Sequence, residues 1–140
     1  GRLMTSSLVD SNIIIDILEE NAWSPWSERQ VLSAAEAGAL VVNQIVLAET
    51  AGYFETEANL DRSLATLRLT KEDLPWRAAV NAGLSHARYR KQGGERDRVL
   101  PDFLIGAHAA IKGYRLLTRD ARRYRRYFPD LEIIAPDTHP

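Results

Sequence analysis

The chain has 140 residues, a net charge of −1 and no cysteine. This length is typical of a single domain with a complete hydrophobic core, and we expect that domain to cover residues 4–136. The absence of cysteine excludes disulfide bonds, thiolate catalysis and cysteine-ligated zinc or iron–sulfur sites.

The composition and the apolar runs also indicate where in the cell the protein is expected. No apolar run is long enough to cross a bilayer, so we expect no membrane partner. A chain without cysteine fits a cytoplasmic protein. Residues 1–3 precede Met4, and we expect them to be left over from cloning.

The small net charge hides an asymmetry along the chain. Residues 1–60 carry nine acids against two bases, whereas residues 88–126 carry twelve bases against four acids. Most of these bases are arginines, whose planar guanidinium groups match phosphate oxygens. The basic region therefore suits a nucleic-acid partner, although a solvated helix surface is the simpler explanation for any single arginine.

Apolar runs and helical patterns alternate along the first half of the chain. The expected elements are a strand at 8–9, a helix over 13–18 capped by Ser11 or Asn12, a helix over 24–37, a strand over 39–42 and a helix that begins at Asn43 or Gln44 and reaches Tyr53. Pro25 suits the first turn of the second helix, and Gly38 suits its end.

The second half continues the same alternation. The expected elements are helices over 59–67, 76–91, 102–112 and 121–128, strands over 115–118 and 131–134, and a glycine-containing loop over 92–98. Short apolar strands separated by helices predict an α/β fold with a parallel sheet that is covered on both faces.

Four carboxylates are held by segments that should pack in the core. Asp10 follows the first strand, and Asp120 follows a later one. Ligands of parallel sheets bind at the carboxyl ends of the strands, so these two acids are expected at the same edge. Asp102 lies in the first turn of its helix, and Glu49 is the only charged residue in an otherwise largely apolar helix.

Each of these acids also has a purely structural interpretation. Asp10, Asp102 and Asp120 can each cap a helix, and Glu49 can pair with a buried arginine. Four converging carboxylates repel one another, however, and some would take up protons unless a cation joined them. A hard divalent metal removes that cost and leaves positions open for phosphate and water.

Other residue types give weaker signals. The three histidines are not spaced as a metal-binding set, no serine has the pattern of a nucleophile elbow, and no phosphate-binding glycine motif is present. The tryptophans Trp23, Trp26 and Trp76 are predicted to fill the core or a subunit contact. Tyr124 and Phe128, four residues apart, are predicted to be core residues.

At these residues the chain resembles the PIN-domain family and, within it, the VapC-type toxins of bacterial toxin–antitoxin pairs. The matching stretches are residues 8–16, 43–49, 100–109 and 116–120, in the order that the family has them. The resemblance implies a three-layer α/β/α sandwich with a central parallel sheet. It also implies a ribonuclease that uses Mg²⁺ or Mn²⁺, a homodimer, and a VapB-like antitoxin as partner.

The resemblance assigns roles to individual residues. Asp10, Glu49 and Asp102 match the acidic triad that is catalytic and binds the metal in the family, and Asp120 matches its more variable fourth acid. Asn12 and Thr118 match polar positions that support the site.

The implied chemistry is hydrolysis of RNA phosphodiesters by a metal-activated water, leaving a 5′-phosphate and a 3′-hydroxyl. Arginines near the last acid are expected to hold flanking phosphates: Arg119, Arg122, Arg123, Arg125 and Arg126. Asp16 lies in the first matching stretch, and we expect it to face solvent.

Two alternatives stay open. Response-regulator receivers and haloacid-type phosphatases also place aspartates at strand ends, but this chain has Asn12 where the phosphatases need an acid, and no lysine follows the last strand. A catalytically silent PIN-like module would bind RNA or a partner without cutting. Metal-dependent cleavage separates that module from the nuclease.

Overall fold

The computed structural model describes residues 5–93 and 100–140. The expected cloning remnant at residues 1–3 and most of the expected loop over residues 92–98 lie outside this range. Among the described residues, no helix is both long and apolar enough to span a membrane.

The described part of the chain contains one parallel sheet of five strands. They are β1 (Ser7–Val9), β2 (Leu40–Val42), β3 (Leu69–Lys71), β4 (Arg115–Leu117) and β5 (Ile133–Ile134). Their order across the sheet is β3-β2-β1-β4-β5, and every neighbouring pair is parallel. The predicted parallel sheet is therefore confirmed.

The strand β3 is the one element that the sequence pattern does not predict. Only Leu69 of its three residues is buried, whereas Thr70 and Lys71 are exposed at the edge of the sheet. An edge strand of this kind carries no apolar run, and the lysine helps to keep another chain from pairing with it.

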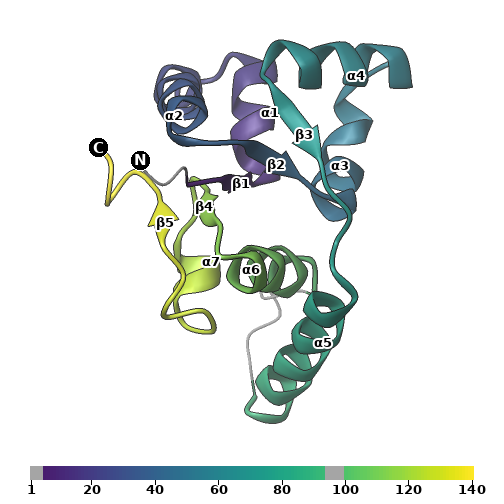
Figure 1. Ribbon diagram of the computed structural model, residues 1–140, viewed down its shortest axis with the longest axis vertical. Coiled ribbons are helices and arrows are strands. Elements are labelled where there is room, and N and C mark those ends of the chain that lie inside the picture. The colour runs from purple at the N-terminus through teal and green to yellow at the C-terminus, as the bar shows by residue number, and fades with distance from the viewer. Residues whose placement is uncertain (1–4, 94–99) are drawn as a thin grey trace.

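Seven helices pack around the sheet in the described residues. They are α1 (Ser11–Glu19), α2 (Ser24–Ala37), α3 (Gln44–Thr50), α4 (Glu57–Thr66), α5 (Trp76–Lys91), α6 (Leu100–Lys112) and α7 (Arg122–Arg125), and a short 3-10 helix, η1 (Ala51–Tyr53), follows α3. Figure 1 shows α1 and α2 on one side of the sheet and α5 and α6 on the other. This arrangement is the predicted three-layer α/β/α fold.

Three helices begin or end at residues other than those predicted from the sequence. The helix α1 begins at Ser11 because Asp10, rather than Ser11 or Asn12, caps it and accepts a hydrogen bond from the Ser11 amide. The helix α6 begins at Leu100, two residues before the predicted start. The helix α7 ends at Arg125, so Phe128 lies beyond it.

The tryptophans differ in their environments. Trp26 is buried in the core and donates a hydrogen bond to the carbonyl oxygen of His139 at 2.6 Å. Trp23 and Trp76 are 41% and 91% exposed, so a core role is wrong for these two.

The strand order reverses beside β1. The chain runs from β1 through β2 to β3 on one side of the sheet, and then returns to place β4 and β5 on the other side. Strand order thus reverses between β1 and β4, which is where ligands of open parallel sheets bind. Asp10 follows β1, and Thr118 follows β4 at the same edge.

Two glycines test how tightly the helices on one face are packed. A Cβ atom at Gly106, in α6, would collide with the ring of Phe128, whereas one at Gly83, in α5, meets no atom within 4 Å. Gly106→Ala should lower the free energy of unfolding by about 1–3 kcal/mol through overpacking. Gly83→Ala should raise it by up to about 1 kcal/mol, because alanine favours helix.

Urea denaturation of both variants against the parent chain measures the difference. Equal effects at the two positions would contradict the close contact between α6 and Phe128.

Candidate functional site

Asp10 is the most firmly held residue of the candidate site. The residue is 3% exposed, and its carboxylate accepts three strong hydrogen bonds. The Ser11 amide donates to Oδ1 at 2.8 Å, while the Thr118 hydroxyl and the Tyr124 hydroxyl donate to Oδ2 at 2.9 and 2.8 Å. These donors come from α1, from the end of β4 and from α7, so Asp10 joins three segments and has one orientation.

The predicted polar pair Asn12 and Thr118 lies next to this carboxylate. The Asn12 side-chain amide donates to Thr118 Oγ1 at 3.2 Å, and the Arg119 amide donates to Asn12 Oδ1 at 3.1 Å. The Asp120 amide also donates to Thr118 Oγ1, at 3.1 Å. The Thr118 hydroxyl therefore accepts two hydrogen bonds and donates one to Asp10. It thereby links the Asp10 carboxylate to the backbone of Asp120.

Glu49 reaches the same place from α3. The Ser11 hydroxyl donates to Glu49 Oε1 at 3.1 Å. Burial raises the pKa of Glu49 above its ordinary value, and the charge of Asp10 raises it further, while the hydrogen bond from Ser11 and the charge of Arg123 oppose the rise. The positive charge near Glu49 is thus too weak to offset the effects of burial and of Asp10 on its carboxylate.

The other two acids meet at Arg123. Asp102 is 4% exposed in the first turn of α6, and its Oδ1 lies 3.7 Å from Arg123 Nη1. Asp120 Oδ2 lies 3.0 Å from Arg123 Nε. Burial alone would lower the pKa of Arg123, but Asp102 and Asp120, helped by Tyr124 and Asp10, raise it. One guanidinium therefore connects two carboxylates.

All four predicted acids are connected in one network, and the network suits a hard cation. The network offers carboxylate oxygens, which Mg²⁺ and Mn²⁺ prefer as ligands. The raised pKa of Glu49 means that the site disfavours a further negative charge, which a bound cation would offset. Among the residues that the structure describes, no three His, Cys, Asp or Glu side chains stand close enough to bind one ion as they are placed. A metal would have to draw the carboxylates inward.

Two site residues were not singled out by the sequence. Ser11 was considered as a helix cap and rejected as a nucleophile, yet its hydroxyl contacts Glu49. Tyr124 is fully buried, as predicted for a core residue, but its hydroxyl binds Asp10. Burial and the charge of Asp10 raise the pKa of Tyr124 well above its ordinary value, so the hydroxyl stays a donor. A tyrosine where phenylalanine would fill the core is the signal for this contact.

The expectation that Asp16 faces solvent is wrong. Its carboxylate is fully buried and accepts hydrogen bonds from Asn21 at 2.9 Å, Ser27 at 3.0 Å and Arg119 at 2.8 Å. The guanidinium of Arg119 also lies over the ring of Trp23, at 5.6 Å from its centre. Arg119 is therefore committed to holding α1 and α2 against the loop after β4.

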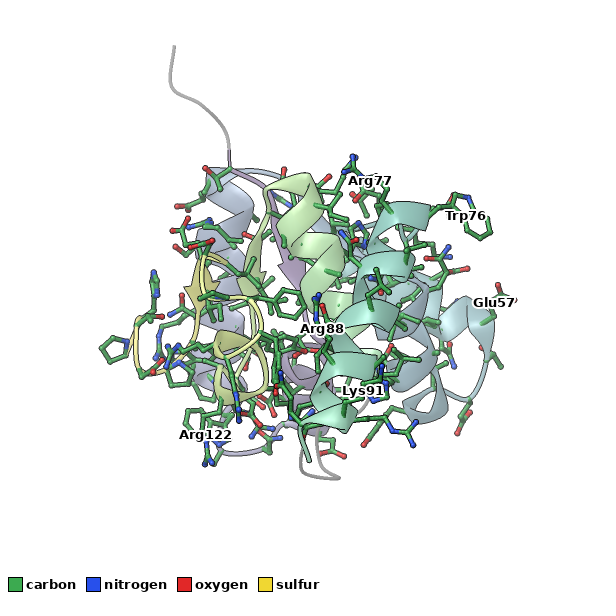
Figure 2. The ribbon with its side chains drawn as sticks, turned by 90° about the horizontal axis from the view of Figure 1, so that it is seen from below. Glu57, Trp76, Arg77, Arg88, Lys91 and Arg122 are labelled. Carbon is green, nitrogen blue, oxygen red and sulfur yellow. The ribbon has the colours of Figure 1, made fainter. Side chains whose placement is uncertain are left out.

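The remaining predicted arginines are exposed. Arg125 forms a two-pronged ion pair with Asp137, with Nη2 at 2.8 Å from Oδ1. Arg122 and Arg126 are exposed, and Figure 2 shows Arg122 at the edge of the molecule. The guanidinium of Arg126 lies over the ring of Tyr127, at 5.5 Å from its centre. These two match the prediction of accessible phosphate-binding groups better than Arg119 does.

A buried histidine supports the helix that carries Glu49. Asn43 caps α3, because its Oδ1 accepts a hydrogen bond from the Val46 amide. Its amide nitrogen therefore faces His108 Nδ1 at 3.0 Å, and His108 Nε2 lies 2.7 Å from Glu72. Since Asn43 donates, Nδ1 must accept and Nε2 must carry the proton. These contacts give His108 a structural role, in line with histidines that are not spaced as a metal-binding set.

Removing the Tyr124 hydroxyl tests how Asp10 is held. Tyr124→Phe keeps the ring but loses the hydrogen bond to Asp10 Oδ2. Hydrogen bonds to charged groups contribute about 1.5–3 kcal/mol, so the free energy of unfolding at neutral pH should fall by about that amount in urea denaturation. Tyr127→Phe keeps the ring contact of Tyr127 with Phe103 and serves as the control. An unchanged stability of Tyr124→Phe would contradict the role of this contact.

Comparison with known proteins gives one family. Among solved structures, the VapBC2 complex of Rickettsia felis bound to a promoter DNA fragment matches with a TM-score of 0.71 and 17% identity, over 94% of this chain and 98% of that chain. DNA-bound VapBC of Salmonella typhimurium matches with a TM-score of 0.64 and 22% identity, over 94% and 98%. FitAcB of Neisseria gonorrhoeae matches with a TM-score of 0.62 and 17% identity, over 96% and 99%.

The sequence comparisons complete this result. No curated protein matches the chain significantly. The family model of the PIN domain matches residues 7–129, which is most of the sequence. The chain therefore belongs to the PIN domain family.

Proposed function

We propose that this protein is a metal-dependent endoribonuclease and the toxin of a toxin–antitoxin pair. The observation that carries the proposal is the network of Asp10, Glu49, Asp102 and Asp120, which meets where strand order reverses. Membership of the PIN domain family supports it, because the four acids match the acidic positions on which the resemblance to PIN nucleases rests.

In this proposal Asp10, Glu49 and Asp102 hold Mg²⁺ or Mn²⁺, and Asp120 assists them. A cation held there would lower the pKa of a water molecule and stabilise the charge that develops on the phosphate. Neighbouring side chains hold the carboxylates in fixed orientations. Thr118 and Tyr124 fix the orientation of Asp10, and Ser11 does the same for Glu49. Asn12 acts one step away, because it holds Thr118.

The exposed arginines next to the site bind the RNA backbone in this proposal. Arg122 and Arg126 are exposed on the segment that also carries Arg123. Phosphate contacts of this kind release counterions, so binding weakens steeply as salt is added. Unstacked RNA loops are the substrates that such a site can reach, since paired bases are shielded in a helix.

An antitoxin is the proposed protein partner. The structural relatives include toxin–antitoxin complexes such as VapBC of Salmonella typhimurium. A groove of about 560 Å³ between α1, α2 and the end of α4 is lined by apolar side chains, among them Ile17, Val31 and Leu32, and by two acids, Glu28 and Glu36, against one base, Arg68. An antitoxin segment with an apolar face and basic residues complements that lining.

A second copy of the chain is the other proposed partner. Trp76, Val80 and Leu84 lie four residues apart on α5 and are 91%, 61% and 58% exposed. Figure 2 shows Trp76 pointing away from the body of the molecule at the start of this helix. An exposed apolar stripe of this size is typical of a protein–protein contact, and it supports a homodimer.

A charge in this stripe tests the homodimer. The parent chain should show twice its mass of 15.7 kDa in light scattering after size exclusion. Val80→Asp should show the single mass, because it places a carboxylate in the apolar contact. Glu57→Gln, an exposed change on α4, should keep the double mass. A parent chain that runs at the single mass would overturn the dimer.

The decisive experiment for the nuclease is cleavage of total RNA by the purified protein. With Mg²⁺ or Mn²⁺ we expect discrete fragments with 5′-phosphate ends, and with EDTA none. Asp10→Asn should lower the rate at least about 100-fold, since even residues that only support metal ligands cost 10- to 100-fold. Asp61→Asn, which changes an exposed acid paired with Lys71, should cleave as the parent does.

The alternative function has its own outcome in the same assay. Intact RNA under every metal and salt condition, with folded protein free of antitoxin, would identify a PIN-like module that binds without cutting.

A further inference from the structure

Arg123 forms ion pairs with two of the acids that are proposed to bind the metal. Its Nε lies 3.0 Å from Asp120 Oδ2 and its Nη1 lies 3.7 Å from Asp102 Oδ1. The same guanidinium is close enough to Glu49 to act on that carboxylate electrostatically. One positive charge thus stands among carboxylates that arrive from α3, α6 and the loop after β4.

A divalent cation and this guanidinium would compete for the same carboxylates. A metal held by Asp102 and Asp120 would lie close to the guanidinium that already pairs with them, and two like charges at close range repel each other. The ion pairs of Arg123 are also weak enough to break. Its side chain is 46% exposed, and pairs with this much solvent contact contribute little to stability.

The helix α7 allows Arg123 to leave without disturbing the rest of the site. Its neighbour Tyr124 is fully buried and bound to Asp10. Arg123 lies on the exposed side of the same four-residue helix. The arginine side chain can therefore turn outward while Tyr124 keeps the backbone of α7 in place.

We infer that Arg123 is a resident counter-ion of the acidic site, that the divalent cation displaces it, and that the displaced guanidinium binds a phosphate of the RNA beside the cleaved bond. The inference rests on the proposed function. It gives Arg123 a role that Arg122 and Arg126 do not have, because it couples metal binding to RNA binding. A guanidinium matches phosphate oxygens in two-pronged geometry, so the released group has a partner as soon as RNA is present.

Titration of the purified protein with Mn²⁺ alone, followed by calorimetry, tests the first step. Arg123→Gln should bind Mn²⁺ about five- to tenfold more tightly than the parent, as expected for the loss of two weak ion pairs. Arg123→Lys keeps the competing charge and should stay near the parent. Arg29→Gln removes an exposed charge on α2 and should not change the affinity.

The second step is read from RNA cleavage at saturating Mn²⁺. Arg123→Gln should raise KM several-fold and leave kcat nearly unchanged, because the lost contact is to a phosphate and not to the reacting atoms. Arg123→Lys should recover part of the loss in KM.

The outcomes separate this inference from the proposed function. Equal Mn²⁺ affinities of the parent and Arg123→Gln would overturn the displacement while leaving the nuclease intact. Tighter Mn²⁺ binding with an unchanged KM would overturn the phosphate contact. A parent chain that binds no Mn²⁺ would overturn both the proposed function and this inference.

Discussion

The backbone hydrogen bond from the Asp10 amide to the carbonyl oxygen of Leu117 joins the end of β1 to the end of β4 at 2.9 Å, and the candidate site is built across this junction. It brings Asp10 beside Thr118, although they are 108 positions apart in the sequence. Several contacts of the site extend this one. Asn12 and Asp120 meet on Thr118, and Tyr124 closes over the same carboxylate.

Charge sets the second constraint. Four carboxylates in one network repel one another, and the fold relieves this repulsion with neutral donors where it can. Ser11, Thr118 and Tyr124 all donate hydroxyl protons to these acids. Neutral donors orient a carboxylate and leave its negative charge in place, so the attraction for a divalent cation is kept. Arg123 is different, because it partly cancels that charge.

The sequence predicted the parallel sheet, the long helices and the acids, because each depends on a local pattern. Buried strands such as β2 are uninterrupted apolar runs, and Asp10 follows such a run directly. What it could not predict depends on contacts between distant segments. Asp16 appeared to face solvent, since nothing near it in the chain shows that Arg119 and Ser27 enclose it. The edge strand β3 was missed because half-exposed strands lack an apolar signature.

The chain of contacts from Glu72 through His108 to Asn43 restricts what can cap α3. Aspartate and asparagine are about equally good at this position of a helix, and an aspartate would accept from the Val46 amide as well. Its second oxygen, however, would face the lone pair of His108 Nδ1, which needs a donor. Only an amide offers an acceptor to the helix and a donor to the imidazole at once. The choice of residue 43 is thus tied to the tautomer of a ring on another helix.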